Sequence, residues 1–128
     1  MKTQTPPEVV LQLRADPAQF SGLRRIIGAH LRLWGRFPLA SAAELCVTEL
    51  LSNVHRHAGS PECELSLRLL ADGVEVAVSD RSYVLPRVTG LPAWRSETGR
   101  GLSVVAGVAD NWGTTPTASG KRVWAVLR

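Results

Sequence analysis

The sequence feature that most constrains the fold is a pair of alternating segments on either side of Asp72-Gly73. Apolar and polar side chains alternate along residues 63–69 and again along residues 74–78. Because successive side chains of a strand point to opposite faces of a sheet, each segment predicts a strand with one buried face. An Asp-Gly pair between two such segments is typical of a two-residue hairpin turn. We therefore expect an antiparallel hairpin with Asp72-Gly73 as its turn.

Similar patterns elsewhere extend the sheet and supply the helices. Alternation predicts further strands at residues 8–14, about 111–117 and 122–127. Apolar residues at helical spacing predict helices at about 17–35, 41–58 and 102–109. The elements then follow the order β, α, α, β, β, loop, α, β, β. This order predicts an α+β fold, a two-layer sandwich in which three helices cover one face of a mixed, mostly antiparallel sheet.

Length and composition suit one domain with a single core. The chain has 128 residues, of which 45% are hydrophobic. We expect the domain to span residues 1–128, with residues 1–7 flexible. No apolar run approaches the ~18 residues of a membrane span, and none follows Lys2 as a signal peptide would require. We therefore expect a cytoplasmic protein without membrane contact.

The basic charge of the chain comes mostly from arginine. A net charge of +4 would suit a nucleic-acid partner, because basic side chains neutralise backbone phosphates. The arginines, however, are spread along the sequence without a basic run or interleaved aromatic residues, so we expect no direct nucleic-acid binding. An acidic protein partner or a nucleotide would explain the charge equally well.

The spacing of cysteines and histidines argues against a metal site built from them. Cys46 and Cys63 form no C-x-x-C pair and fall on an expected helix and strand, so we expect reduced, packed thiols. His55 and His57 are two residues apart, about 200° around a helix, and cannot bind one metal ion together.

A second stripe of polar residues lies beside the apolar stripe of the expected helix at 41–58. Ser41 is a possible N-cap of this helix, and a start two or three residues earlier is the alternative. Glu49, Asn53 and His57 are spaced four residues apart, so their side chains point the same way from successive turns. Asn53 offers a neutral oxygen to a magnesium ion that keeps several waters, and Glu49 can take a proton from an attacking hydroxyl. A solvated helix face would show the same spacing, so this pair alone leaves both interpretations open.

Three further features follow downstream. Asp80 closes the second strand of the hairpin, and residues 81–98 then run without sustained periodicity. A connection of this length is either a lid or binding loop, or a tolerated insertion. Gly99-Arg100-Gly101 then opens the last helix, where exposed N–H groups and the helix dipole favour a phosphate. Simple turn chemistry would also explain these glycines.

Taken together, Glu49-x-x-x-Asn53, Asp80 and Gly99-Arg100-Gly101-Leu102 resemble in order and spacing the ATP-binding domain of the GHKL superfamily, shared by gyrase and histidine kinases. The resemblance covers about residues 8–127 and implies a Bergerat-type sandwich. Residues 49–58 are similar to the first motif of the bacterial anti-sigma factor serine/threonine kinases. Membership of that group would imply ATP and Mg²⁺ as cofactors, a sigma factor and a STAS-type anti-anti-sigma protein as partners, and a possible homodimer.

The resemblance also assigns roles to individual residues. Asn53 would coordinate magnesium, and Glu49 would act as general base toward a serine hydroxyl. Asp80 would accept a hydrogen bond from the adenine amino group and so favour adenine over guanine. Residues 81–98 would form the ATP lid. The remaining residues that the resemblance assigns to the nucleotide are His57, Gly99, Arg100, Gly101 and Leu102.

The sequence departs from the family pattern at the adenine end. Relatives usually have glycine where this chain has Ser82, and they often carry a threonine just after the glycine of the last strand, where this chain reads Gly120-Lys121-Arg122. We expect Ser82 and Arg122 to affect the adenine pocket.

These features support an ATP-dependent kinase that acts in partner switching. The alternative is a catalytically silent module that keeps the fold and regulates a sigma factor or another protein by contact alone. A third hypothesis, the detached catalytic half of a histidine kinase, is less favoured because the sequence shows no phosphoacceptor helix pair.

Overall fold

The computed structural model describes residues 6–82 and 97–128, and of residues 97–102 the backbone alone. Residues 1–5 and 83–96 lie outside this description. Most of the segment expected to be flexible, at 1–7, therefore falls outside the described residues, as does most of the expected lid at 81–98.

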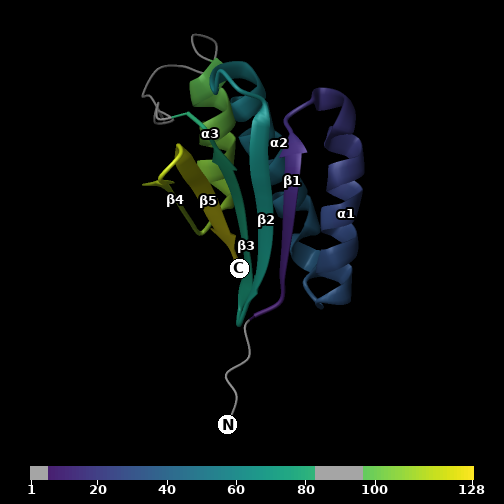
Figure 1. Cartoon of the computed structure of the whole chain (residues 1–128). Helices are drawn as coiled ribbons and strands as arrows, with labels where there is room; N and C mark the ends of the chain where they lie inside the picture. Colours follow the sequence, from purple (N-terminus) through teal and green to yellow (C-terminus); the bar gives the residue numbers. More distant parts are fainter. Residues whose placement is uncertain (1–5, 83–96) are drawn as a thin grey trace.

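In the described part of the chain, five strands form a single sheet in the order β1-β2-β3-β5-β4 (Figure 1). Their bounds are β1 Glu8–Arg14, β2 Glu62–Leu70, β3 Gly73–Asp80, β4 Asn111–Pro116 and β5 Lys121–Leu127. Each strand pairing within the described residues is antiparallel. The sequence predicts a mixed, mostly antiparallel sheet, and the described residues contain no parallel pair.

Three helices of residues 6–82 and 97–128 cover one face of this sheet, as predicted (Figure 1). They are α1 Phe20–Leu33, α2 Ala40–His57 and α3 Glu97–Val108. Two short 3-10 turns, η1 Pro17–Gln19 and η2 Phe37–Leu39, lead into α1 and α2. The prediction of a two-layer α+β sandwich is therefore confirmed. Within the described ranges, no helix is both long enough and apolar enough to cross a membrane.

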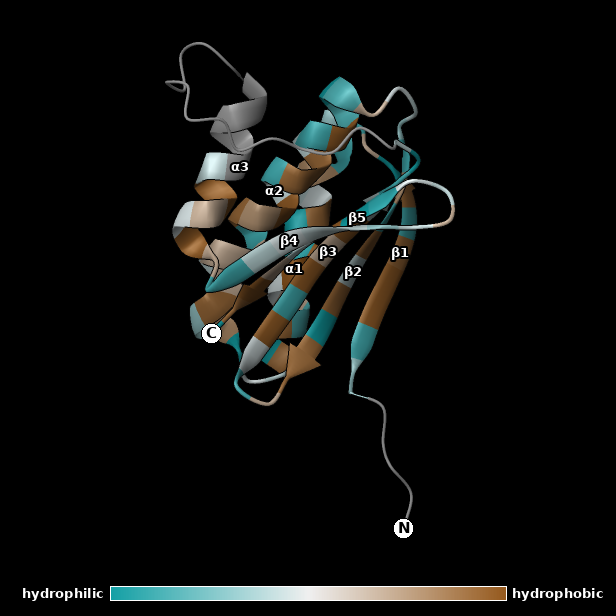
Figure 2. Ribbon diagram, turned by 90° about the vertical axis from the view of Figure 1, so that its left-hand side faces the viewer, coloured by the Kyte–Doolittle hydropathy of each residue, from teal (hydrophilic) through white to brown (hydrophobic). Residues whose placement is uncertain are grey.

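The core lies between the helix layer and the sheet. Figure 2 shows hydrophobic residues recurring along the strands and on the helices. The largest fully buried side chains of the strands are Leu65, Leu67, Val74, Val76, Val78 and Leu127. From α2, the side chains of Val47, Leu50, Leu51 and Val54 join the same cluster. Each aliphatic side chain removed from water in this way contributes about 1.5–3 kcal/mol to folding.

Glycines end the first two helices where the sequence predicts. Gly35 follows α1 with φ of 71°, and Gly59 follows α2 with φ of 73°. This left-handed backbone region favours glycine because a side chain there is strained. Of the two starts that the sequence allows for α2, the structure has the earlier one, because the helix begins at Ala40 after Leu39, without a side-chain cap. Ser41 therefore lies inside the first turn and is not the N-cap.

The turn of the central hairpin lies one residue earlier than predicted. Leu70 pairs with Gly73, so the turn residues are Ala71 and Asp72. Gly73 belongs to β3, where an added Cβ atom would lie 1.9 Å from the carbonyl oxygen of Leu127. Glycine is thus needed at this position for the close approach of β5 and not for the turn. The Asp-Gly pattern cannot reveal this reason, because it arises from contact with a distant segment.

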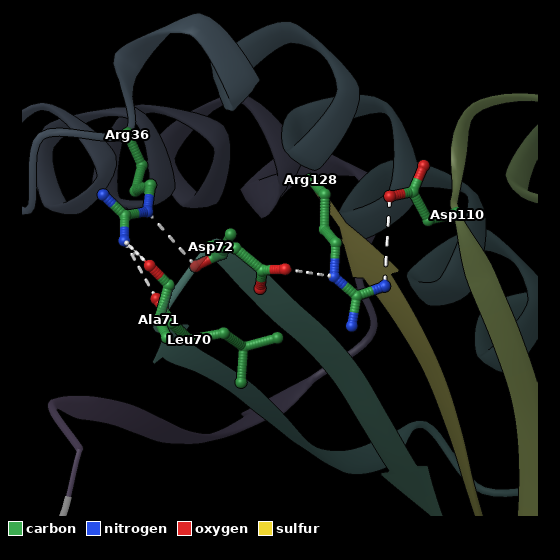
Figure 3. A network of polar contacts seen from close by, with 7 residues as sticks. Arg36, Leu70, Ala71, Asp72, Asp110 and Arg128 are labelled. Carbon is green, nitrogen blue, oxygen red and sulfur yellow. Dashed lines mark hydrogen bonds and ion pairs between the residues drawn. The ribbon is translucent and has the colours of Figure 1, made fainter.

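Arg36 binds this turn from the helix layer (Figure 3). Its guanidinium group donates hydrogen bonds to the carbonyl oxygens of Leu70 at 2.9 Å and Ala71 at 3.1 Å. On the other side, Arg128 donates to the Asp72 carboxylate at 2.9 Å. Two arginines from distant parts of the chain thereby fix the end of the hairpin opposite the end at which Asp80 lies.

We expect the substitution Gly73→Ala to lower the free energy of unfolding by about 1–3 kcal/mol, because the new methyl group would overlap the β5 backbone. Gly22→Ala provides the matched control. Gly22 lies in α1 with no atom within 4 Å of an added Cβ, so alanine there should stabilise the protein by up to about 1 kcal/mol. Urea denaturation measures both changes, and equal effects of the two substitutions would contradict the assignment of Gly73 to a close backbone contact.

Candidate functional site

The polar stripe predicted on α2 lies on a continuous helix. Glu49 and Asn53 are partly buried and His57 is exposed, each one turn from the next along α2. The neighbouring side chains Leu50 and Val54 are buried in the core and fix the rotation of the helix about its axis. The carboxylate and the carboxamide therefore lie at the margin between the core and solvent, where a bound molecule can reach them.

Three elements that carry predicted site residues meet at one end of the molecule. Figure 1 shows that α2 and β3 finish at the end of the sandwich where α3 begins. α2 and α3 also pack against each other. The fold thus brings the last turns of α2, Asp80 at the end of β3, and the start of α3 to the same end of the sandwich.

The start of α3 differs from the prediction. The helix begins at Glu97, so the segment Gly99-Arg100-Gly101-Leu102 lies within its first turns and does not precede it. Glu97 and Thr98, the last two residues of the expected lid segment 81–98, are therefore helical. The structure gives the backbone of these residues but no side-chain positions, so their roles toward a nucleotide remain predictions. The N–H groups of the first turn of α3 point toward this end of the molecule, and the N-terminus of a helix favours an anion.

Asp80 is buried and already holds three hydrogen bonds. Its Oδ1 atom accepts from the backbone N–H of Ser82 at 2.8 Å and from Nζ of Lys121 at 3.1 Å. Its Oδ2 atom accepts from the same Nζ at 2.9 Å. The two side chains are only 2% and 5% exposed for Asp80 and Lys121, respectively. The carboxylate is therefore a fixed, charge-paired group, because a buried carboxylate is stable only with such partners.

Sheet register explains why this pair forms. Asp80 and Lys121 are direct partners in the antiparallel ladder between β3 and β5, and both side chains lie on the face that carries Val78 and Val123. Gly120 precedes Lys121, and an added Cβ atom there would lie 2.0 Å from the carbonyl oxygen of Asp80. The absence of a side chain at this position lets β5 begin close enough to β3 for the two charges to meet.

The structure corrects the prediction that Arg122 affects the adenine end. Because neighbouring strand residues point to opposite faces, Arg122 lies on the open face of the sheet, where it pairs with Glu75 at 2.5 Å. Lys121 is the residue that contacts Asp80, and the sequence analysis missed it. The signal was present, since Lys121 directly follows Gly120 at the place where relatives often carry threonine.

Ser82 acts through its backbone in a way that the sequence did not predict. Its N–H group donates to the side chain of Asp80, two residues earlier, which is the geometry of an Asx turn. Any residue except proline could supply this donor. The departure from glycine at this position therefore leaves the orientation of the Asp80 carboxylate intact.

A hollow of about 510 Å³ opens at this end of the sheet, and Asp80 lines it together with residues of the open face. Its lining includes Gln12, Arg14, Glu62, Ser79 and Arg81, which come from β1, β2, β3 and the residue after β3, and no residue of α2 lines it. The candidate site is on the helix side, between α2, the end of β3 and the start of α3. We therefore assign the site from its chemistry and not from the size of this hollow.

Both cysteines are buried and free, in accordance with the prediction of reduced, packed thiols. Burial raises the pKa of Cys46 to about 11, and the nearby charge of Glu49 adds to the effect. Burial likewise raises the pKa of Cys63 to about 11, with a further contribution from Asp80. Both thiols are therefore protonated near neutral pH and are poor nucleophiles. Among the described residues, no group of three or more metal-ligating side chains comes together.

These two pKa values predict a loss of stability at alkaline pH. In the unfolded chain the thiols ionise near their ordinary pKa of 9, whereas in the folded protein they stay protonated to about 11. Between these values the unfolded state binds fewer protons, so the free energy of unfolding falls as pH rises, by about 1.4 kcal/mol per pH unit and thiol. Urea denaturation of the reduced protein from pH 8 to pH 11 measures this slope. The double variant Cys46→Ala, Cys63→Ala should show a shallower slope, and an unchanged slope would contradict the buried-thiol explanation.

Comparison with known proteins identifies the kind of domain. Residues 13–127, which are 115 of the 128 residues, match the family model of the histidine kinase-like ATPase domain. The matched range includes α2, the end of β3, α3 and β5, and with them every residue assigned above to the candidate site. No curated protein gave a significant match to the chain.

Proposed function

The chain belongs to the histidine kinase-like ATPase domain family, and on this premise we propose that it is an ATP-dependent protein serine/threonine kinase of the anti-sigma factor type. Family membership supports an ATP-binding domain of the GHKL type. The observation that carries the more specific proposal is the pair Glu49 and Asn53, which lie one turn apart on α2, the helix that finishes where β3 ends and α3 begins. A domain that only held ATP would need the amide but would have no chemical need for the carboxylate beside it.

The side-chain oxygen of Asn53 is a suitable ligand for magnesium. Magnesium prefers oxygen ligands, keeps several waters and is usually held by one or two protein groups together with the phosphates of the nucleotide. Asn53 supplies such an oxygen, and the described residues contain no cage of three or more ligating side chains that would favour another metal. Bound magnesium would neutralise the negative charge that develops on the transferred phosphoryl group.

Glu49 is the proposed general base. The incoming serine hydroxyl would donate its proton to a carboxylate oxygen of Glu49 as its own oxygen forms a bond to the γ-phosphorus. The bond between that phosphorus and the β–γ bridging oxygen then breaks, and ADP leaves. Partial burial of Glu49 limits the water around the carboxylate and so favours transfer to the serine over hydrolysis.

The proposed partners follow from the resemblance of residues 49–58 to the anti-sigma factor kinases. The kinase would bind a sigma factor and would phosphorylate a serine of a STAS-type anti-anti-sigma protein, and this phosphorylation would change which partner is bound. The net charge of +4 suits an acidic protein surface. A homodimer is part of the same proposal.

One observation favours the alternative, a silent module that regulates a partner by contact alone. Lys121 and the Ser82 N–H group already occupy three of the roughly four acceptor positions of the Asp80 carboxylate. An aspartate held in this way keeps one acceptor position for the adenine amino group, whereas a lone carboxylate has about four. If the pocket cannot bind ATP, the same fold and the same surface would still be able to bind a protein.

Substitutions on α2 distinguish the two functions. We expect Asn53→Ala to weaken magnesium-dependent ATP binding by about 100-fold or more, because the amide oxygen is the proposed metal ligand. Glu49→Ala should keep binding within about threefold and should lower phosphoryl transfer by about 100-fold or more, because only proton transfer is lost. Calorimetry measures the binding, and radiolabelled ATP measures transfer to STAS-type proteins encoded by the same genome.

Glu44→Ala is the matched control, because Glu44 is a carboxylate on the same helix that faces α1 and not the site. It should leave both binding and transfer unchanged. ATP binding by all three variants at the affinity of the parent protein would show that the site is assigned wrongly. Binding of ATP without transfer to any STAS-type protein would favour the silent module.

A further inference from the structure

The ion pair between Asp80 and Lys121 bears on which base the nucleotide site selects. We propose that Lys121 is a specificity-determining residue, and that the Asp80–Lys121 pair reads the purine edge in place of a lone aspartate. As a consequence, the site discriminates weakly between adenine and guanine. This inference rests on the proposed function, because it requires that a nucleoside triphosphate binds at this end of the domain.

The pair is a fixed part of the end of the sheet. Both charged groups are almost completely buried, and Nζ of Lys121 lies 2.9 Å and 3.1 Å from the two carboxylate oxygens. Gly120 and the strand register fix the approach of the two side chains. Because a buried charge is costly to leave without its partner, Lys121 stays on Asp80 when a ligand enters.

The remaining hydrogen-bonding capacity of the pair is one acceptor and one donor. A carboxylate has about four acceptor positions, and the described contacts of Asp80 use three of them. An ammonium group has three hydrogens, and the contacts of Lys121 with Asp80 use two. The fourth acceptor position lies on Oδ2 and the third hydrogen on the adjacent Nζ, so the two are next to each other.

A lone aspartate and this ion pair offer different hydrogen-bonding groups to a purine base. A lone carboxylate only accepts, so it binds the amino group of adenine and repels the O6 atom of guanine, which is also an acceptor. The pair offers a donor as well. Adenine presents its amino group beside the acceptor N1, whereas guanine presents the acceptor O6 beside the N1–H donor. Each purine can therefore satisfy both members of the pair, with the positions of donor and acceptor exchanged.

The first test compares ligands and needs no variant. Calorimetric titration of the full chain with the magnesium complexes of ATP, GTP and purine riboside triphosphate measures the three affinities. Purine riboside lacks the amino group and keeps N1. We expect the three dissociation constants to lie within about 30-fold of one another, because Lys121 still donates to N1 or O6 in each case. A preference for ATP above about 30-fold over GTP would overturn the inference.

The second test removes the donor. In Lys121→Thr, which resembles the family pattern, we expect the ratio of the GTP to the ATP dissociation constant to rise at least tenfold over that of the parent. Arg122→Thr removes an equal charge from the adjacent position on the opposite face of the sheet, and we expect it to leave the ratio unchanged. Circular dichroism establishes that each variant is folded, and the ligand comparison above decides the matter if Lys121→Thr does not fold.

The outcomes separate this inference from the proposed function. If Lys121→Thr is folded and keeps the ratio of the parent, or if Arg122→Thr changes the ratio as much, Lys121 does not determine specificity and the inference is overturned. ATP binding with a strong preference over GTP also overturns it but leaves the proposed kinase intact. Failure of the folded parent to bind any of the three nucleotides overturns the proposed function and this inference with it.

Discussion

The packing of α2 against the sheet is the constraint on which the candidate site depends. Leu50, Leu51 and Val54 are almost completely buried, and they lie between α1, α3 and the central strands. A rotation of α2 by one residue position, about 100°, would bring these side chains toward solvent at a cost of about 1.5–3 kcal/mol each. The orientation of Glu49 and Asn53 is therefore set by the packing of these neighbouring apolar side chains in the core.

The second constraint is the register between β3 and β5. Lys121 can pair with Asp80 only because the two residues are direct partners across the ladder and Gly120 permits a close approach. A shift by one residue would bring Arg122 to the helix side and Lys121 to the open face. The pair adds little stability in itself, because desolvation of two charges offsets most of their attraction. The pair instead fixes the orientation of the Asp80 carboxylate at the end of β3 and keeps this carboxylate ionised.

Local periodicity explains which parts of the fold the sequence predicts. The hairpin strands, the helix ends at Gly35 and Gly59, and the polar stripe of α2 follow from patterns within a few residues, and the structure confirms them. The errors have another origin. The position of the hairpin turn depends on Leu127, which lies far away in the sequence, and the partner of Asp80 depends on strand register. Neither can be deduced from neighbouring residues, although Lys121 directly follows a glycine that the sequence analysis had singled out.

We propose that this end of the sandwich, where α2 and β3 finish and α3 begins, is a magnesium-dependent ATP site. Calorimetric titration of the full chain with ATP, with magnesium and then with an excess of a magnesium chelator, tests it most directly. We predict saturable binding of one ATP per chain that is lost when magnesium is removed. The absence of saturable binding to the folded protein, or binding that is indifferent to magnesium, would contradict this account.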